Sequence, residues 1–199
     1  KIGKEMAVAV KEGGPDPIAN SKLAALIAKA KANNVPNDNI DRIIKKASSA
    51  DSADYEEIVY EGYGPCGVAV IVETTTDNRN RTASDVRHYF DKFGGNLGTT
   101  GCVSFMFTEK GVIVVEDEDE LMEDALEAGA ADFSGEDGVY EITTEPDDLE
   151  AVREALEAKG YPIASADTDK IPSSYISLSD EDDIKHMSLL LENLEDNDD

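Results

Sequence analysis

Residues 110–170 contain two successive segments with the same order of strand-like and helix-like patterns, and this repeat constrains the fold more than any other feature. GVIVVE and VYEITTE have the β-branched and aromatic composition of strands. DELMEDALEAGA and DDLEAVREALEAKG have the apolar spacing of amphipathic helices, and their endings match closely. YPIASAD and a short strand expected near residues 131–133 complete the order βαββαβ. That order predicts a ferredoxin-like domain.

A second α/β pattern precedes this domain. YEEIVYEGY and GVAVIVETTT are strand-like runs separated by the turn residues Gly64 and Pro65, which predicts a hairpin. A helix is expected over about residues 83–93, with Thr82 as its N-cap. CVSFMF, residues 102–107, is expected to be the next strand. These elements predict an incomplete α/β sandwich, because a second helix is missing.

The last segment, residues 171–199, supplies one more strand and the missing helix. Ser179 is the expected N-cap of this helix, which carries an apolar stripe on one side. Because such a stripe needs a sheet to pack on, we expect the chain to leave the middle domain, build the third and return.

The first region is predicted to be helical throughout. One helix is expected over residues 3–12 and another over NSKLAALIAKAKANN. The third has Asn37 as its expected N-cap, and the apolar residues of its core face are Ile40, Ile43, Ile44 and Ala47. The opposite face of this helix is cationic.

These patterns predict an α+β fold of three domains: an N-terminal three-helix domain and two ferredoxin-like α/β domains, the third inserted into the second. The expected boundaries are residues 1–52 for the helical basic domain, 53–109 with 171–199 for the discontinuous middle domain, and 110–170 for the acidic third domain. ASSADSAD, residues 47–54, has the composition of a linker between the first two.

Charge is distributed unevenly along the chain. The formal net charge is −26, but residues 1–52 carry nine Lys and Arg against six Asp and Glu, whereas residues 111–199 carry four against twenty-nine. Such asymmetry predicts a basic contact surface near one end of the chain and an acidic, solvated part near the other.

Composition excludes several classes of protein. No apolar run approaches the ~18–20 residues that span a bilayer, and the first residues lack the apolar stretch of a signal peptide, so we expect no membrane association. Two cysteines, Cys66 and Cys102, are too few for a disulfide framework, which favours a cytoplasmic setting. Their spacing with His88 and His186 does not indicate a metal site, and we expect neither a metal nor a cofactor.

Catalytic motifs are also missing from the sequence. It contains no GxSxG elbow, no phosphate loop ending in GK[ST] and no HExxH, and its glycines do not follow the dinucleotide-binding spacing. We therefore expect a protein that is not an enzyme, although an active site assembled from distant residues stays an alternative.

The stretch TDNRNRTASDVRH places Arg79 and Arg81 beside an expected helix start. A phosphate there would meet both guanidiniums and unpaired backbone N–H groups. The alternative is that both arginines pair with carboxylates of the chain itself, such as Asp77. The sequence leaves both readings open.

Cations of the first region suggest a broader nucleic-acid surface. Each could contact a phosphate and add salt-dependent affinity without reading sequence. The candidate nucleic-acid-binding residues, with those of the middle domain, are Lys4, Lys11, Lys22, Lys29, Lys31, Arg42, Lys45, Lys46, Arg79, Arg81 and Arg87. Residues 1–52 contain no aromatic side chain, which argues against a platform for stacking single-stranded bases.

GGPDPIANSKLAALIAKAKANNVPNDNIDRIIKKA, YEGYGPCGVAVIVETTTDNRNRTASDVRHYFDKFGGNLGTTGCVSFMF and the later IPSS closely resemble the YebC/PmpR family, which also includes a mitochondrial translational activator of a cytochrome oxidase subunit. The resemblance implies three domains, no enzymatic activity, and contact with phosphate backbones. Members of the family usually begin with a strongly basic segment that the printed sequence lacks, so we expect its net charge to omit the most cationic part.

The resemblance implies a DNA-binding transcriptional regulator. Its alternative is a ribosome- and rRNA-associated translation factor that relieves stalling at proline-rich stretches. The expected partners are therefore DNA or ribosomal RNA, the latter within the ribosome, and the expected oligomeric state is a monomer or a weak dimer. A small-ligand sensor is a further alternative, because ferredoxin-like domains often bind metabolites between sheet and helix.

Overall fold

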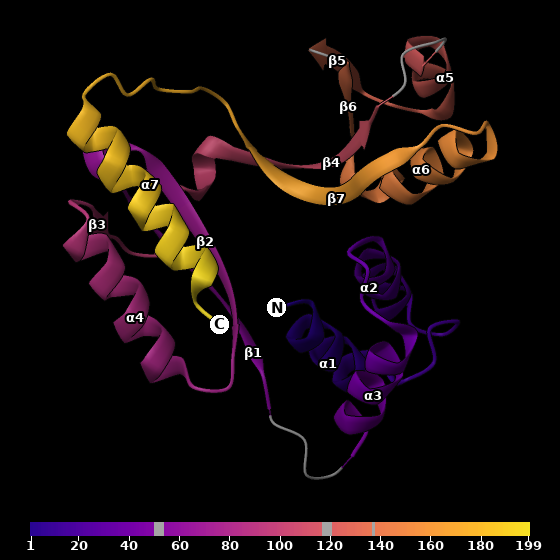
Figure 1. The fold of residues 1–199 in the computed structure, drawn as a ribbon, viewed down its shortest axis with the longest axis horizontal. Helices are drawn as coiled ribbons and strands as arrows, with labels where there is room; N and C mark the ends of the chain where they lie inside the picture. Colours follow the sequence, from indigo (N-terminus) through magenta and orange to yellow (C-terminus); the bar gives the residue numbers. More distant parts are fainter. Residues whose placement is uncertain (50–53, 117–120, 137) are drawn as a thin grey trace. The chain divides into compact units, whose positions relative to one another are not determined.

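The computed structural model describes residues 1–49, 54–116, 121–136 and 138–199 (Figure 1). Half of the expected linker at residues 47–54, namely residues 50–53, lies outside the described residues. The chain forms two compact units, of which the first comprises Lys1–Phe105 and Ile176–Asp199 and the second comprises Met106–Tyr175. The second unit is therefore inserted into the first, and the α+β fold class is confirmed.

Three helices open the first unit: α1 (Ile2–Gly13), α2 (Ser21–Ala32) and α3 (Asn37–Ala47). Their apolar faces meet in a core whose buried members are Met6, Ala7, Ala9, Val10, Leu23, Ala30, Ile40 and Ala47. Asn20 joins two of the helices, because its side chain accepts a hydrogen bond from the backbone N–H of Leu23 and donates to the carbonyl of Ala9. The predicted three-helix arrangement is thus confirmed.

The expected cap of α3 was wrong. Pro36, not Asn37, occupies the N-cap position, and no side chain caps this helix. Pro36 has an extended backbone, with φ −60° and ψ 144°, so that the helix begins at the next residue. Asn37 is therefore the first helical residue, where its side chain cannot serve as the cap.

The rest of the first unit is a sheet with two helices. Strands β1 (Glu56–Tyr63) and β2 (Ala69–Thr76) pair antiparallel around a short turn, η1 (Pro65–Gly67), as the hairpin prediction required. A two-residue strand, β3 (Asn96–Leu97), pairs with β1 and gives the order β2-β1-β3. Helices α4 (Arg79–Lys92) and α7 (Glu181–Asp196) share one core with the sheet, and its buried members are Val70, Val86, Phe90, Phe93, Met187 and Leu190.

The return of the chain to this sheet is confirmed, because α7 contributes Met187 and Leu190 to the same core as α4. The cap of α7 differs from the prediction. Asp180, not Ser179, accepts hydrogen bonds from the backbone N–H groups of Asp182 and Asp183. A carboxylate is the stronger acceptor at a helix N-terminus, because it also interacts favourably with the helix dipole.

Two predicted strands are absent from the described residues. Ser104–Met106 form a short helical turn, η2, instead of a strand over residues 102–107. The backbone N–H groups of this loop donate to the side chain of Glu61, so they are not available for a sheet. No separate strand follows residue 172 either, because the preceding strand already runs to Pro172, which lacks an N–H group.

The second unit has the predicted order of elements. They are β4 (Phe107–Val115), α5 (Leu121–Ala128), β5 (Asp132–Glu136), β6 (Val139–Thr144), the short turn η3 (Pro146–Asp148), α6 (Leu149–Ala158) and β7 (Ile163–Pro172). The strands form an antiparallel sheet in the order β5-β6-β4-β7, which is the ferredoxin-like order. Both helices pack on the same buried sheet residues, Ile113, Val115 and Ile142. The ferredoxin-like prediction is therefore confirmed for this unit.

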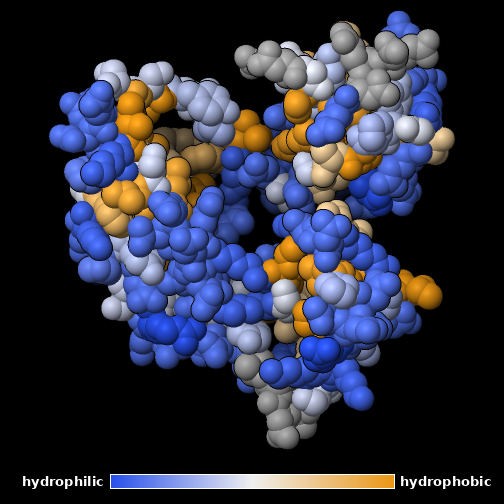
Figure 2. Space-filling model, in the orientation of Figure 1, coloured by the Kyte–Doolittle hydropathy of each residue, from blue (hydrophilic) through white to orange (hydrophobic). Residues whose placement is uncertain are grey.

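The face of the molecule drawn in Figure 2 is mostly hydrophilic, in agreement with a chain of which 31% is charged. Within the described ranges, no helix combines the length and apolar composition required to cross a membrane.

Candidate nucleic-acid interface

Helix α4 begins at Arg79, earlier than expected, and this moves both arginines of DNRNRT into its first turn. Asn78 is the N-cap, with its side chain accepting a hydrogen bond from the backbone N–H of Arg81 at 3.1 Å. Thr82 was the wrong choice of cap, because its side chain is buried inside the helix start and lies 2.7 Å from the hydroxyl of Thr76. The side chain of Asn78, one turn before Thr82, is the one that reaches the free backbone N–H groups of the helix start.

Arg79 pairs with a carboxylate of β1. Its Nη2 donates to Oε2 of Glu56 at 2.9 Å, and both side chains are largely exposed. The hydrogen bond from Arg79 lowers the pKa of the Glu56 carboxyl, and the same bond raises the pKa of the guanidinium. Because the pair is on the surface, it is strongly screened by water and salt.

Arg81 pairs with two carboxylates. Its Nε and Nη2 donate to the two oxygens of Asp199 at 3.1 and 2.7 Å, and Nη2 also donates to Asp77 at 2.8 Å. Asp77 is about as exposed as Arg81, whereas the Asp199 side chain is only 3% exposed. The bidentate geometry makes the bond to Asp199 the stronger of the two.

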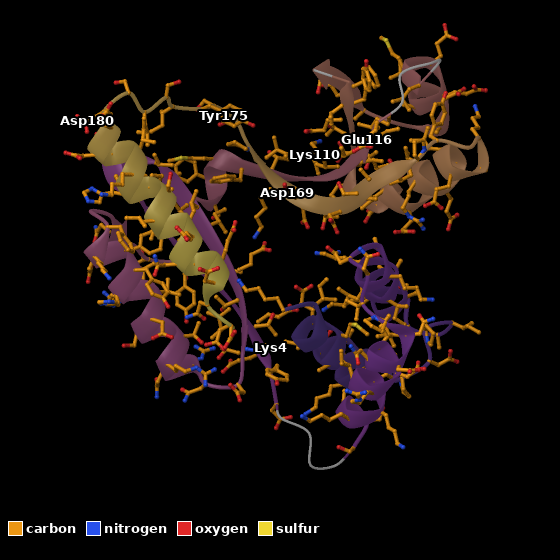
Figure 3. All side chains as sticks on the ribbon, in the orientation of Figure 1. Lys4, Lys110, Glu116, Asp169, Tyr175 and Asp180 are labelled. Carbon is orange, nitrogen blue, oxygen red and sulfur yellow. The ribbon has the colours of Figure 1, made fainter. Side chains whose placement is uncertain are left out.

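Asp199 gathers donors from three segments of the first unit. Besides Arg81, its carboxylate accepts from Lys4 Nζ at 2.9 Å and lies 2.8 Å from the hydroxyl of Thr82. Lys4, which is labelled in Figure 3, belongs to α1. Its Nζ also lies over the ring of Tyr55. Hydrogen bonds from Arg81, then Lys4 and Thr82, hold the pKa of the Asp199 carboxyl far below its usual range.

Both arginines of DNRNRT therefore meet carboxylates of the chain in this structure. Of the two readings that the sequence left open, the geometry matches internal pairing. No sequence signal pointed to Asp199 as the partner of Arg81, because the two residues lie 118 positions apart and the acidic segment around residue 199 contains many similar side chains.

Several cations of the first domain are likewise paired. Lys11 Nζ lies 2.5 Å from Asp54, and Lys22 Nζ lies 3.2 Å from Glu12 and 3.7 Å from Glu57. Hydrogen bonding and Coulombic attraction to these glutamates outweigh desolvation, so the pKa of Lys22 is raised. The positive charges of these two lysines and of Lys4 are therefore paired with carboxylates of the chain itself.

The remaining cations differ in their exposure and pairing. Lys29 is half-buried on α2. Of the candidate nucleic-acid-binding residues, those that are exposed and have no carboxylate partner among the residues that the structure describes are Lys31 in the last turn of α2, Arg42, Lys45 and Lys46 on α3, and Arg87 on α4.

Helix α3 brings three of these cations onto one side. Arg42, Lys45 and Lys46 are three and four residues apart, which places them on the face opposite the buried Ile40 and Ala47. Asp38 and Asp41 in the same helix carry negative charge nearer its N-terminus. The cationic end of α3 is therefore its last turn, where positive charge also complements the helix dipole.

Sequence comparisons relate this chain to known proteins. Residues 1–50 match the family model described as the TACO1/YebC protein N-terminal domain, and residues 55–199 match the TACO1/YebC second and third domain. A protein of Ruminiclostridium cellulolyticum named probable transcriptional regulatory protein is 60% identical over 98% of this chain and 82% of its own length. A protein of the same name from Acetivibrio thermocellus is 59% identical over 100% of this chain and 85% of its own length.

A solved structure resembles the whole chain. The crystal structure of a conserved hypothetical protein from Aquifex aeolicus superimposes with a TM-score of 0.90 and 45% identity, covering 100% of this chain and 84% of the other.

Proposed function

Because this chain belongs to the TACO1/YebC family, we propose that it is a non-enzymatic cytoplasmic regulator of gene expression that binds the phosphate backbone of nucleic acid. The relatives are named probable transcriptional regulatory proteins, which favours DNA as the target. The observation that carries the proposal is the set of exposed cations on α3, Arg42, Lys45 and Lys46, which no carboxylate of the described chain neutralises.

The chemistry of these side chains suits a backbone contact. Lysine and arginine bind phosphate oxygens without reading bases, and each contact releases a counterion from the nucleic acid. Lys31 and Arg87, both exposed, extend the proposed contact set. Arg79 and Arg81 would contribute less, because a phosphate must compete there with the carboxylates of Glu56 and Asp199.

The absence of aromatic residues from residues 1–52 favours a double-stranded target over a splayed single strand. Duplex DNA and double-helical ribosomal RNA both offer a regular phosphate backbone, so the same surface serves the translational alternative. The two targets are distinguished by direct competition.

The test measures binding of the full chain to a fluorescent 20-base-pair DNA duplex, and to an RNA duplex of the same sequence, from roughly 50 to 200 mM salt. The triple variant Arg42→Gln, Lys45→Gln, Lys46→Gln should lose affinity, and its salt slope should fall by about 0.9 for each phosphate contact removed. A matched triple variant, Lys92→Gln, Lys159→Gln, Lys185→Gln, changes the net charge equally at other exposed lysines.

Equal losses in the two triple variants would contradict the α3 surface, since they would reflect net charge alone. No binding to either duplex would contradict the proposed function. If the chain bound the RNA duplex more tightly than the DNA duplex, a role in translation would replace the proposed role in transcription.

A further inference from the structure

The sheet of the second unit carries helices on one face only among the residues that the structure describes. Ile113, Val115 and Ile142 are fully buried beneath α5 and α6. Because successive residues of a strand point to opposite faces, Val112 and Val114 of β4 lie on the other side, where they are half-buried. We call this side the open face.

The centre of the open face is aliphatic. Val112 and Val114 lie on the inner strand β4, and Val139 of the neighbouring strand β6 is 46% exposed. Val139 shares the face because it is two residues before Glu141, which is the register partner of Val114. An exposed valine on an inner strand costs solvation free energy unless a partner covers it.

Carboxylates surround this centre. Asp169 of β7 lies opposite Lys110 of β4, and both residues are labelled in Figure 3. Glu141 of β6 lies opposite Val114, and Asp132 of β5 lies opposite Thr143. All three acids are exposed. Lys110 offers them little compensation, because its Nζ lies 2.6 Å from Glu145. Glu141 and Asp169 form no ion pair with any described residue of the chain.

This combination excludes some occupants. Four-stranded sheets of this topology that bind RNA stack bases on aromatic side chains of the inner strands. The inner strands here present Val112, Val114, Val139 and Glu141 on the open face, and the carboxylates repel phosphate. A second copy of the same face would bring like charges together, which also costs free energy.

We propose that the open face of the second unit is a docking surface for a basic protein segment. Lysine and arginine fit it because their aliphatic stems can cover the valines while their charged ends reach Glu141, Asp169 and Asp132. The segment and the open face are complementary in charge and in layout, because acidic residues border the apolar centre of the face. This inference is independent of the nucleic-acid surface, which lies in the other unit.

The test uses the full chain and a fluorescent ten-residue peptide that alternates lysine and leucine. The double variant Glu141→Gln, Asp169→Asn should weaken peptide binding at least fivefold. The control variant Glu123→Gln, Glu154→Gln removes the same charge from exposed sites on α5 and α6 and should change binding less than twofold. Thermal melts verify that both variants are folded.

Methyl NMR spectra of the full chain locate the contact. The peptide should shift the resonances of Val112, Val114 and Val139 more than those of the buried Ile113 and Ile142. Equal loss of affinity in the two double variants would overturn the proposal, since binding would then follow net charge. Unmoved valine resonances would overturn it too, as would the same shifts produced by a DNA duplex or by self-association without peptide.

Discussion

Arg81 and Asp199 form a bidentate ion pair across 118 positions of sequence, with the aspartate side chain almost completely buried. The same carboxylate binds Lys4 of α1 and contacts Thr82 of α4. One acidic side chain therefore connects the helical domain, the DNRNRT helix and the segment after α7. The guanidinium that resembled a phosphate site in the sequence is a structural element of this junction.

Replacing Asp199 by alanine should destabilise the protein. The change leaves Lys4 and Arg81 without their shared partner and removes one of the acceptors of the Thr82 hydroxyl, and we expect a loss of about 2 kcal/mol in the free energy of unfolding. Arg81 is 45% exposed, so water will satisfy part of its lost bonding. Urea denaturation of both proteins measures the difference.

The matched control for this prediction is Glu56→Ala, which removes the exposed partner of Arg79. We expect no measurable change in its stability, because both members of that pair are accessible to water. If the two variants were equally stable, the junction at Asp199 would not hold the fold together.

Acid should weaken the protein through two buried carboxylates. Backbone N–H groups, first that of Gly101 and then those of the following loop, hold the pKa of Glu61 below its usual range, and Arg81 does the same for Asp199. A carboxyl whose pKa is depressed in the folded state stabilises it fully above its unfolded pKa of about 4. That contribution is lost as the pH falls through the folded pKa.

The variant Glu61→Gln isolates this effect. With 44 acidic residues, protonation also relieves repulsion in the folded chain, so the pH profile of the wild type combines opposite contributions. The difference in unfolding free energy between wild type and Glu61→Gln should be constant from pH 7 to about 5 and shrink below about pH 4. A difference independent of pH would show that the carboxylate charge is irrelevant to the loop.

Local patterns predicted most elements of the fold because their causes are local. The hairpin follows from two β-branched runs around Pro65, and α3 follows from the spacing of its isoleucines. The wrong helix caps were local errors of one to four residues, whereas the wrongly predicted strand over residues 102–107 depends on a distant group. Residues 102–107 were predicted to form a strand, but the carboxylate of Glu61, about forty positions away, accepts hydrogen bonds from the backbone N–H groups of Val103 and Ser104. Hydrogen bonds of this kind leave no periodic signal in the sequence.

The candidate site could be predicted from the sequence only where local patterns determine it. The cationic face of α3 follows from the helix period, so Arg42, Lys45 and Lys46 could be grouped from sequence. The pairing of Arg81 depends on which of many acids the fold brings near it, and composition cannot select Asp199. The open sheet face required the strand order β5-β6-β4-β7, which decides which residues become neighbours.

Cys66 should react slowly with thiol reagents although it is exposed. Its Sγ donates to Oδ2 of Asp183 at 2.9 Å, and the hydrogen bond raises the pKa of the thiol because the neighbouring carboxylate disfavours a thiolate. Asp183→Asn should lower that pKa and speed alkylation by iodoacetamide at pH 8. Both rates are measured in a Cys102→Ser background, so that Cys66 alone is followed. An unchanged rate would contradict the thiol–carboxylate contact.

Two glycines should respond oppositely to alanine. A Cβ on Gly62, in the middle strand of its sheet, would lie 2.7 Å from the carbonyl oxygen of Asn96 and 3.0 Å from the ring of Phe90, neither of which can move easily. Such overpacking typically costs about 1–3 kcal/mol. A Cβ on Gly3, in α1, would lie 3.4 Å from the flexible end of Ile43.

Gly3→Ala should therefore stabilise the protein by about 0.5 kcal/mol, because alanine loses less backbone entropy in a helix than glycine does. Urea denaturation of wild type, Gly62→Ala and Gly3→Ala gives the three free energies of unfolding under identical conditions. If Gly62→Ala were as stable as the wild type or more stable, the backbones of β1 and β3 would have to lie farther apart at Gly62 and Asn96 than the structure shows. Destabilisation by Gly3→Ala would contradict the packing of α1 against α3, because Ile43 would then have no room to adjust.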